Sequence, residues 1–282
     1  MNTVKTLGGV IAAMVIFFAA MIIGTLPASL LMMIGVPVWI CNAIAGVLYL
    51  ILTLLLVKLV YGKIFKLSTE ELGIGSFSVR PGCIVIAIVI PAAVTAIYLL
   101  FVRGEFTFLG SDRETILNIL SAGLFYTAIG SGFVEEIIFR GVIMNLLKKR
   151  WNTTVAVLLP SFVFALGHVA GAGSGIADRL LVIIAGTAAG VMFSLIAMKS
   201  GSVWNSAVVH TVWNLFMVGG GLTIGTKAAD DALVTYVLSS KSLILTGGQF
   251  GIESSLIAVI AYIVVAVTVY ALAGKGIRQL KA

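Results

Sequence analysis

Charged side chains are scarce in this sequence. Only 10% of its 282 residues are Asp, Glu, Lys or Arg, while 60% are hydrophobic. Soluble globular domains carry roughly 25% charged residues, so this chain lacks the charge to cover a normal water-facing surface. That shortage excludes a soluble protein. Together with a mean hydropathy of +1.17, it predicts a polytopic membrane protein.

Cysteine is nearly absent as well. The two cysteines, Cys41 and Cys83, both lie in apolar runs and form no CxxC motif. A disulfide framework and a thiol nucleophile are therefore not expected. The net charge of +7 does not indicate nucleic-acid binding, because the basic residues lie mostly at predicted helix ends. No glycine-rich phosphate loop supports nucleotide binding either.

Long apolar runs are what the sequence has in abundance. A spanning helix needs about 20 mostly apolar residues, and eight runs qualify. They lie near residues 7–27, 38–60, 82–102, 118–147, 152–171, 179–198, 202–222 and 254–274. Pro27 and Pro37 are expected to mark the first connection. The predicted fold is an all-α bundle of about eight transmembrane helices, forming a single integral membrane domain over residues 1–282.

Basic residues are divided unevenly between the two sets of helix ends, twelve against five. The larger set is Lys5, Lys58, Lys63, Lys66, Arg80, Lys148, Lys149, Arg150, Lys199, Lys275, Arg278 and Lys281. The smaller set is Arg103, Arg113, Arg179, Lys227 and Lys241. Because Lys and Arg gather in cytoplasmic loops, both termini are predicted to be cytoplasmic.

Away from the span ends, five Asp, Glu, Lys, Arg or His side chains fall inside predicted spans, where such groups are rare and face a cavity or one another. Glu135, Glu136 and Arg140 lie in the fourth span, His168 in the fifth and His210 in the seventh. Counted from the predicted cytoplasmic ends of their helices, Glu135, His168 and His210 lie ~20, ~24 and ~16 Å deep. The three motifs are therefore expected to converge in one layer, near or beyond mid-membrane.

Helical spacing adds detail to this layer. Glu136 and Arg140 are four residues apart, so they are expected to form an ion pair on one helix face. Glu135 is rotated by about 100° from Glu136 and is free to meet another partner. His210 and Asn214 have the same four-residue spacing. For any one of these groups alone, a structural helix–helix contact is an equally good interpretation; their coincidence favours a site.

These side chains fit the hydrolysis of a carbonyl compound, with a peptide as the obvious candidate. Desolvation raises the pKa of a carboxyl group, which makes glutamate a competent base near pH 7. A further histidine and an amide supply donors for an oxyanion. Zinc is the competing interpretation, since His and Glu are good ligands. However, the chain lacks HExxH and its histidines lie in different spans, so neither a metal nor a cofactor is expected.

The three segments resemble the motifs of the CAAX protease and bacteriocin-processing family, also called the CPBP or Abi family. Those motifs are Glu-Glu-x-x-x-Arg, Phe-x-x-x-His and His-x-x-x-Asn. Here they read Glu135-Glu136-Ile-Ile-Phe-Arg140, Phe164-Ala-Leu-Gly-His168 and His210-Thr-Val-Trp-Asn214. All three are complete and in order, within a core of residues 118–222.

The resemblance implies an intramembrane glutamic endopeptidase acting on a peptide or a membrane-protein substrate. It implies that Glu135 and His168 activate water and that His210 and Asn214 stabilise the oxyanion. Glu136 and Arg140 would hold the site together or position substrate. The short loops resemble those of bacterial members, which implies a bacterial plasma membrane and leaves prenyl-protein processing unassigned. No oligomeric state is predicted.

A second class of function stays open at the level of sequence. Buried Glu, His and Arg also build proton relays, so a proton-coupled transporter or a non-catalytic immunity factor is the alternative. Against transport, the chain shows no pair of interrupted helices in matching halves, which is the usual sign of a transporter site. Cleavage of a peptide discriminates between the two classes.

Overall fold

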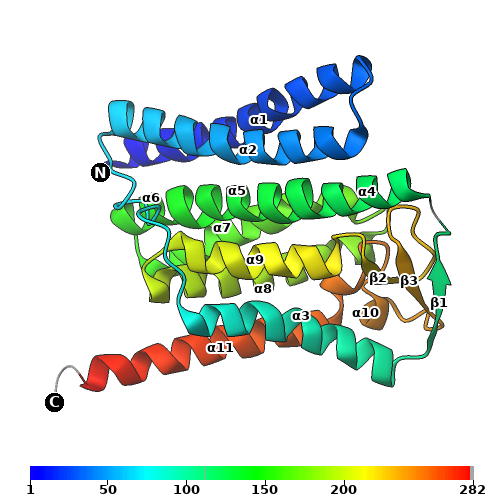
Figure 1. Cartoon of the computed structure of the whole chain (residues 1–282). Helices are drawn as coiled ribbons and strands as arrows, with labels where there is room; N and C mark the ends of the chain where they lie inside the picture. The colour runs from blue at the N-terminus through cyan, green and yellow to red at the C-terminus, as the bar shows by residue number, and fades with distance from the viewer. Residues whose placement is uncertain (111, 280–282) are drawn as a thin grey trace.

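A computed structural model describes residues 1–110 and 112–279 of the chain, with side chains as far as Leu272. Three of the basic residues counted above, Lys275, Arg278 and Lys281, therefore lie outside the described side chains. The helices run roughly side by side in layers (Figure 1). The hairpin of α1 (Thr3–Met33) and α2 (Val38–Val60) covers one side of the bundle, and α3 (Pro81–Phe101) and α11 (Leu256–Gln279) cover the other.

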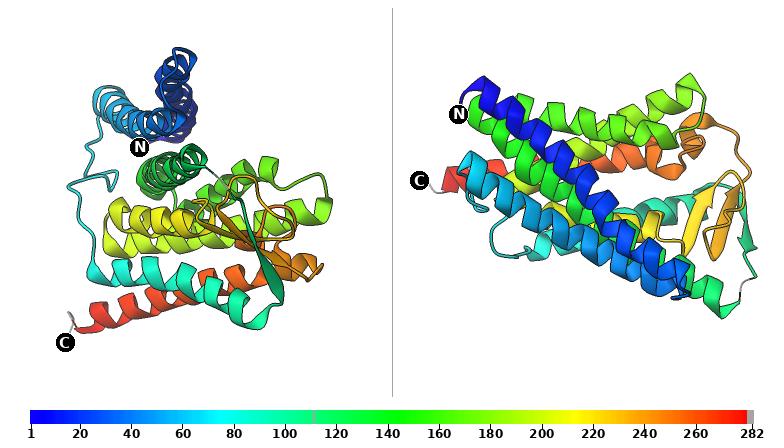
Figure 2. Two further views of the ribbon diagram at one scale, coloured as in Figure 1. Left: turned by 45° about the vertical axis from the view of Figure 1, so that its right-hand side comes forward. Right: turned by 90° about the horizontal axis from the view of Figure 1, so that it is seen from above.

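The motif-bearing helices occupy the middle of this arrangement. The first is one long rod made of α4 (Arg113–Ser121), α5 (Gly132–Glu136) and α6 (Met144–Arg150), joined by two π-helical stretches, Ala122–Ser131 and Ile137–Ile143. Next to it lie α7 (Thr153–His168), α8 (Ile176–Ser200) and α9 (Val203–Met217). The two views of Figure 2 show α1 and α2 lying over the long rod.

Among the described residues, six helices are long and apolar enough to cross a membrane. They span Thr3–Met33, Val38–Phe65, Pro81–Phe101, Arg113–Arg150, Thr153–Gly171 and Ile176–Ser200. The seventh and eighth expected spans correspond to α9, with 15 residues, and to the apolar part of α11, Leu256–Leu272. The prediction of an all-α polytopic bundle is confirmed, and its count of eight is approximate. Large apolar side chains exposed along α1, α3 and α11 present a surface suited to lipid.

Two expected boundaries are wrong. α1 does not end at Pro27 but continues through it to Met33. A proline inside a transmembrane helix is tolerated because neighbouring groups and local adjustments of the backbone can satisfy the carbonyl that it frees. At the other end of the chain, α9 stops at Met217 instead of reaching residue 222, and glycines 219–221 follow it.

A small sheet that the sequence did not predict closes one end of the bundle. It contains β1 (Gly104–Phe108), β2 (Leu222–Gly225) and β3 (Val234–Leu238), in the order β1-β3-β2. β3 is antiparallel to β1 and parallel to β2. A short helix, α10 (Leu243–Thr246), and a turn at Ile252–Ser254 follow before α11. The N-terminus and the C-terminal end of α11 lie at the opposite end (Figure 1), which we call the terminal end, in contrast to the sheet end.

Candidate active site

The site forms where the long rod meets α9 at close range. Gly132 makes this approach possible, because a Cβ there would lie 2.8 Å from Thr211 Oγ1 and 3.0 Å from Thr211 Cα. Gly132 lies one turn before the two glutamates, and Thr211 is the neighbour of His210. The missing side chain therefore lets both carboxylates reach the histidine of α9.

Glu136 and Arg140 form the ion pair that their spacing predicts. Arg140 Nη1 donates to Glu136 Oε1 at 2.8 Å, and both side chains are fully buried. The guanidinium also lies over the rings of Phe164, at 4.5 Å, and Phe193, at 5.3 Å. Cation–π contact of this kind stabilises a desolvated arginine. Each charge of the pair is thus compensated inside the protein.

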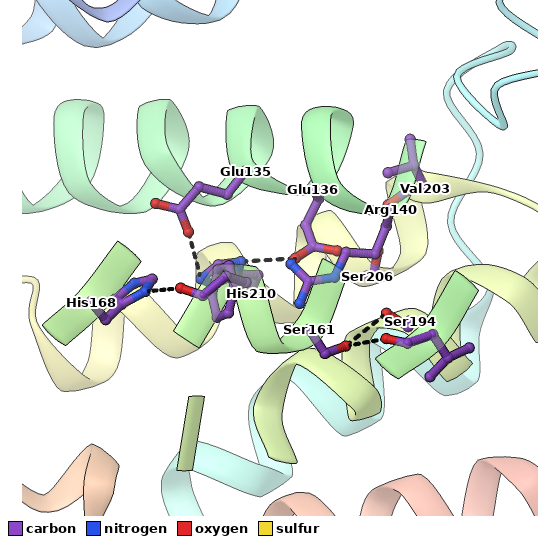
Figure 3. A network of polar contacts seen from close by, with 11 residues as sticks. Glu135, Glu136, Arg140, Ser161, His168, Ser194, Val203, Ser206 and His210 are labelled. Atoms are coloured by element: carbon purple, nitrogen blue, oxygen red, sulfur yellow. Dashed lines mark hydrogen bonds and ion pairs between the residues drawn. The ribbon is translucent and has the colours of Figure 1, made fainter. Parts of the chain in front are cut away.

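His210 lies between the two glutamates (Figure 3). Its Nδ1 is 3.1 Å from Glu136 Oε1, and its Nε2 is 3.8 Å from Glu135 Oε2. Because an ionised carboxylate only accepts hydrogen bonds, Nδ1 carries a proton and donates to Glu136. The ring also stacks on Phe193, with centroids 4.5 Å apart and planes inclined by 18°. Its orientation is therefore fixed by contacts at the ring edge and on the ring face.

His168 has its tautomer set by a different contact. Its Nδ1 lies 2.9 Å from the carbonyl oxygen of Phe164. A carbonyl accepts only, so Nδ1 carries the proton and, in the neutral ring, Nε2 has a free lone pair. Asn214 donates one Nδ2 hydrogen to the Thr127 carbonyl at 3.2 Å, which leaves its second N–H available. The site thus contains a possible proton acceptor and a possible amide donor.

Glu135, His168, His210 and Asn214 line one cavity of about 250 Å³, which we call the central cavity. Glu136 and Arg140 do not line it; Glu136 lies behind His210, in contact with Arg140. Glu135 Oε2 has no hydrogen-bond partner among the described residues. The structure therefore brings all three motifs together and separates them into four cavity-lining groups and one buried ion pair.

Sequence reasoning missed one acidic residue of the central cavity, Glu253. This residue lies in the turn before α11 and accepts from Trp213 Nε1 at 2.7 Å. Burial raises the pKa of the Glu253 carboxyl above its usual value. The sequence offered little signal, because an acid just before an apolar helix is ordinarily a favourable partner for the helix dipole.

No metal centre is apparent from the arrangement of ligands. Among the side chains that the structure describes, no three His, Cys, Asp or Glu residues are grouped as ligands of one ion. Both histidines have Nδ1 on an oxygen acceptor. The expectation of a metal-free and cofactor-free site stays a prediction.

Comparison with known proteins gives one match. Residues 117–216 match the sequence model of a family described as type II CAAX prenyl endopeptidase Rce1-like. No curated protein matches the chain. The matched segment contains the three motifs and every residue that they contribute to the central cavity and its ion pair. The resemblance seen in the motifs is thus confirmed: this segment of an integral membrane protein is similar to the CAAX protease family.

Proposed function

We propose that the protein is an intramembrane endopeptidase that cleaves a peptide bond with water activated by Glu135 and His168. The observation that carries the proposal is the central cavity itself. It brings Glu135 Oε2, which has no hydrogen-bond partner, together with the two histidines and Asn214. Similarity to a protease family over residues 117–216 supports the same reaction class.

The first step is the attack of water on the substrate carbonyl. Glu135 takes a proton from the water, and His168, with its Nε2 lone pair, assists in orienting it. The new C–O bond places negative charge on the former carbonyl oxygen. When the C–N bond then breaks, the proton held by Glu135 passes to the leaving nitrogen. A positioned base of this kind contributes about 10²–10⁴-fold to the rate.

His210 and Asn214 supply the donors for the oxyanion. The second N–H of Asn214 is free for this role. His210 donates from Nε2 only when that nitrogen also carries a proton, because Nδ1 is already engaged with Glu136. Both ring nitrogens face carboxylates, with Nδ1 3.1 Å from Glu136 Oε1 and Nε2 3.8 Å from Glu135 Oε2. Glu136 and Arg140 would then act indirectly, by holding the His210 ring in place without touching the substrate.

The central cavity reaches towards the sheet end, where Val218 and Phe250 line it and the sheet lies beyond them. If the termini are cytoplasmic, as the distribution of basic residues predicts, this is the extracytoplasmic side. We therefore propose a plasma membrane protein of bacterial type that acts on peptide segments at its outer face.

A cleavage assay tests the proposal. Purified protein in detergent is incubated with a panel of membrane-segment peptides and lipidated peptides, and products are identified by mass spectrometry. Endoproteolytic products that require the intact site are expected. A panel left intact by a folded protein would favour the non-catalytic alternative, an immunity factor that acts by binding.

Replacement of the proposed base gives the sharpest control. Glu135→Gln is expected to lower the cleavage rate by about 10²–10⁴-fold, because the amide cannot take a proton from water. The melting temperature should not fall, because glutamine has the shape of glutamate. The only charged partner of Glu135 among the described residues is His210, and the two lie 3.8 Å apart. Wild-type turnover by this variant, in a preparation free of other proteases, would refute the role.

A further inference from the structure

A second and larger cavity adjoins the central one at the sheet end. It has a volume of about 440 Å³ and shares Val218, Phe250 and Glu253 with the central cavity. One wall is β2 with the loop that follows it, and the other is the segment Gly248–Glu253. We call this space the outer cavity. It continues from the central cavity to β2, where Thr223, Ile224 and Gly225 line it.

β2 presents a free edge to this region. The strand order β1-β3-β2 makes β2 an edge strand, and Figure 1 shows it as the strand nearest the helices. The Gly221 carbonyl accepts from Val234 N–H at 3.2 Å. Because backbone groups alternate in direction along a strand, those of Leu222 and Ile224 point away from β3. No other hydrogen bond to them is found in the described part of the chain.

This edge has a fixed position relative to the proposed catalytic groups. β2 follows α9, the helix of His210 and Asn214, after only the four residues 218–221. The side chain of Ile224 is buried in the core with that of Trp213. An extended segment bound along β2 would therefore be held in a defined register with the central cavity.

We infer that β2 is a docking strand: an extended segment of the peptide substrate adds to its free edge as a fourth strand and continues past Phe250 and Glu253 into the central cavity. The inference rests on the proposed function for the identity of the occupant. A peptide backbone is the chemistry that complements a row of unpaired N–H and C=O groups, with side-chain pockets adding specificity. Extension would also present the scissile bond free of helical hydrogen bonds.

The first test measures binding without cleavage. Photoreactive benzoylphenylalanine replaces Lys227, an exposed residue on the wall of the outer cavity, in the Glu135→Gln background. The probe is a pool of random dodecapeptides in detergent. Cross-linking is expected, and Leu222→Pro should lower its yield about two- to tenfold, the effect of one lost backbone hydrogen bond. Leu222→Ala, which keeps the N–H, should retain most of the yield.

The outer edge of the same sheet supplies a matched control. Leu109 N–H donates to the Leu233 carbonyl, so by the same alternation Phe108 N–H points away from β3. Phe108→Pro removes a free edge N–H on β1, which lines neither the central nor the outer cavity. This variant should cross-link as the parent does. A pool with every backbone amide N-methylated should lose cross-linking while the protein is unchanged, which covers the case in which Leu222→Pro misfolds.

The second test uses cleavage of the unmodified pool by protein with native Glu135. Leu222→Pro should lower kcat/KM two- to tenfold, and Phe108→Pro should not. Cross-linking without any cleavage would refute the proposed hydrolysis and keep the docking strand. Equal cross-linking of ordinary and N-methylated pools would overturn the docking strand, as would cleavage indifferent to Leu222→Pro. Cross-linked dimers of the protein in place of peptide adducts would also overturn it and assign the edge to a second copy.

Discussion

The buried ion pair of Glu136 and Arg140 sets the energetic constraint at the scale of single residues. Neither side chain reaches solvent, so each charge depends on its partner and on the aromatic rings around the guanidinium. Arg140 has two further nitrogens, Nε and Nη2, without hydrogen-bond partners among the described residues. The pair is therefore costly to break, and its net contribution relative to an apolar pair is small.

Arg140→Ala is expected to destabilise the protein by about 3–5 kcal/mol, because it leaves Glu136 as an uncompensated buried acid. Thermal unfolding in detergent measures the effect. Lys149→Ala is the matched control: it breaks the exposed pair with Glu71, which should cost no more than about 1 kcal/mol. Equal melting temperatures for both variants and the parent would show that the buried pair contributes nothing.

Asn214→Ala, together with metal analysis, distinguishes the proposed metal-free mechanism from a zinc-dependent one. If Asn214 donates a hydrogen bond to the substrate oxygen only as negative charge develops on it in the transition state, kcat should fall about 10²–10³-fold with little change in KM. Chelators should leave the parent's activity unchanged, and elemental analysis of active protein should find no stoichiometric zinc. Zinc that is lost and restored together with activity would overturn the glutamic mechanism.

At the scale of elements, the helices were predictable because lipid imposes a length of about 20 apolar residues on every span. The sheet was not. β1 and β3 are separated by more than a hundred residues, and strands of four or five residues have no comparable signal. The site residues were predictable because ionisable groups inside spans are rare. Glu253 was not, because it lies outside every predicted span and only the fold brings it to Trp213.

The side-by-side placement of Glu135 and Glu136 around His210 also lay beyond the sequence. Helical spacing predicted different directions for the two carboxylates, but not that one ring would meet both. The rod is wound as π-helix on both sides of α5, and such winding, common at functional sites, changes the angle between successive side chains. The close approach at Gly132 is a tertiary feature as well.

Gly132→Ala tests whether this approach sets the geometry of the site. Its Cβ would meet Thr211 at 2.8 Å, so the rod and α9 must separate, and activity is expected to fall about 10²-fold, as for a misplacement near 1 Å. Gly167→Ala is the control, since nothing lies within 4 Å of its Cβ and alanine favours the helix. Full activity of the Gly132 variant would show that the helices tolerate a wider spacing.

At the scale of the whole molecule, the two ends of the bundle differ in charge and in architecture. The terminal end contains the helix ends that bear Lys58, Lys148 and Lys199, whereas the sheet end contains β1–β3 and the outer cavity. The positive-inside rule and the proposed function together predict that substrate and basic residues lie on opposite sides of the membrane.

Cysteine labelling of intact bacterial cells tests this orientation. After Cys41 and Cys83 are replaced by alanine, single cysteines are introduced as Ser239→Cys, exposed at the sheet end, and Ser76→Cys, exposed at the terminal end. A membrane-impermeant maleimide should label the first in intact cells and the second only after lysis. The reverse pattern would place the cavity mouth in the cytoplasm.

The two hydrogen bonds accepted by Glu136 Oε1 limit which substitutions the site can tolerate in evolution. That one oxygen accepts from both Arg140 and His210. A single substitution of Glu136 would therefore remove the partner of a buried cation and the anchor of the imidazole together. Glu135 and His168 serve no such double role. Under the proposed function, a lineage that gave up hydrolysis yet kept a stable membrane protein would thus lose Glu135 or His168 first and retain Glu136 and Arg140.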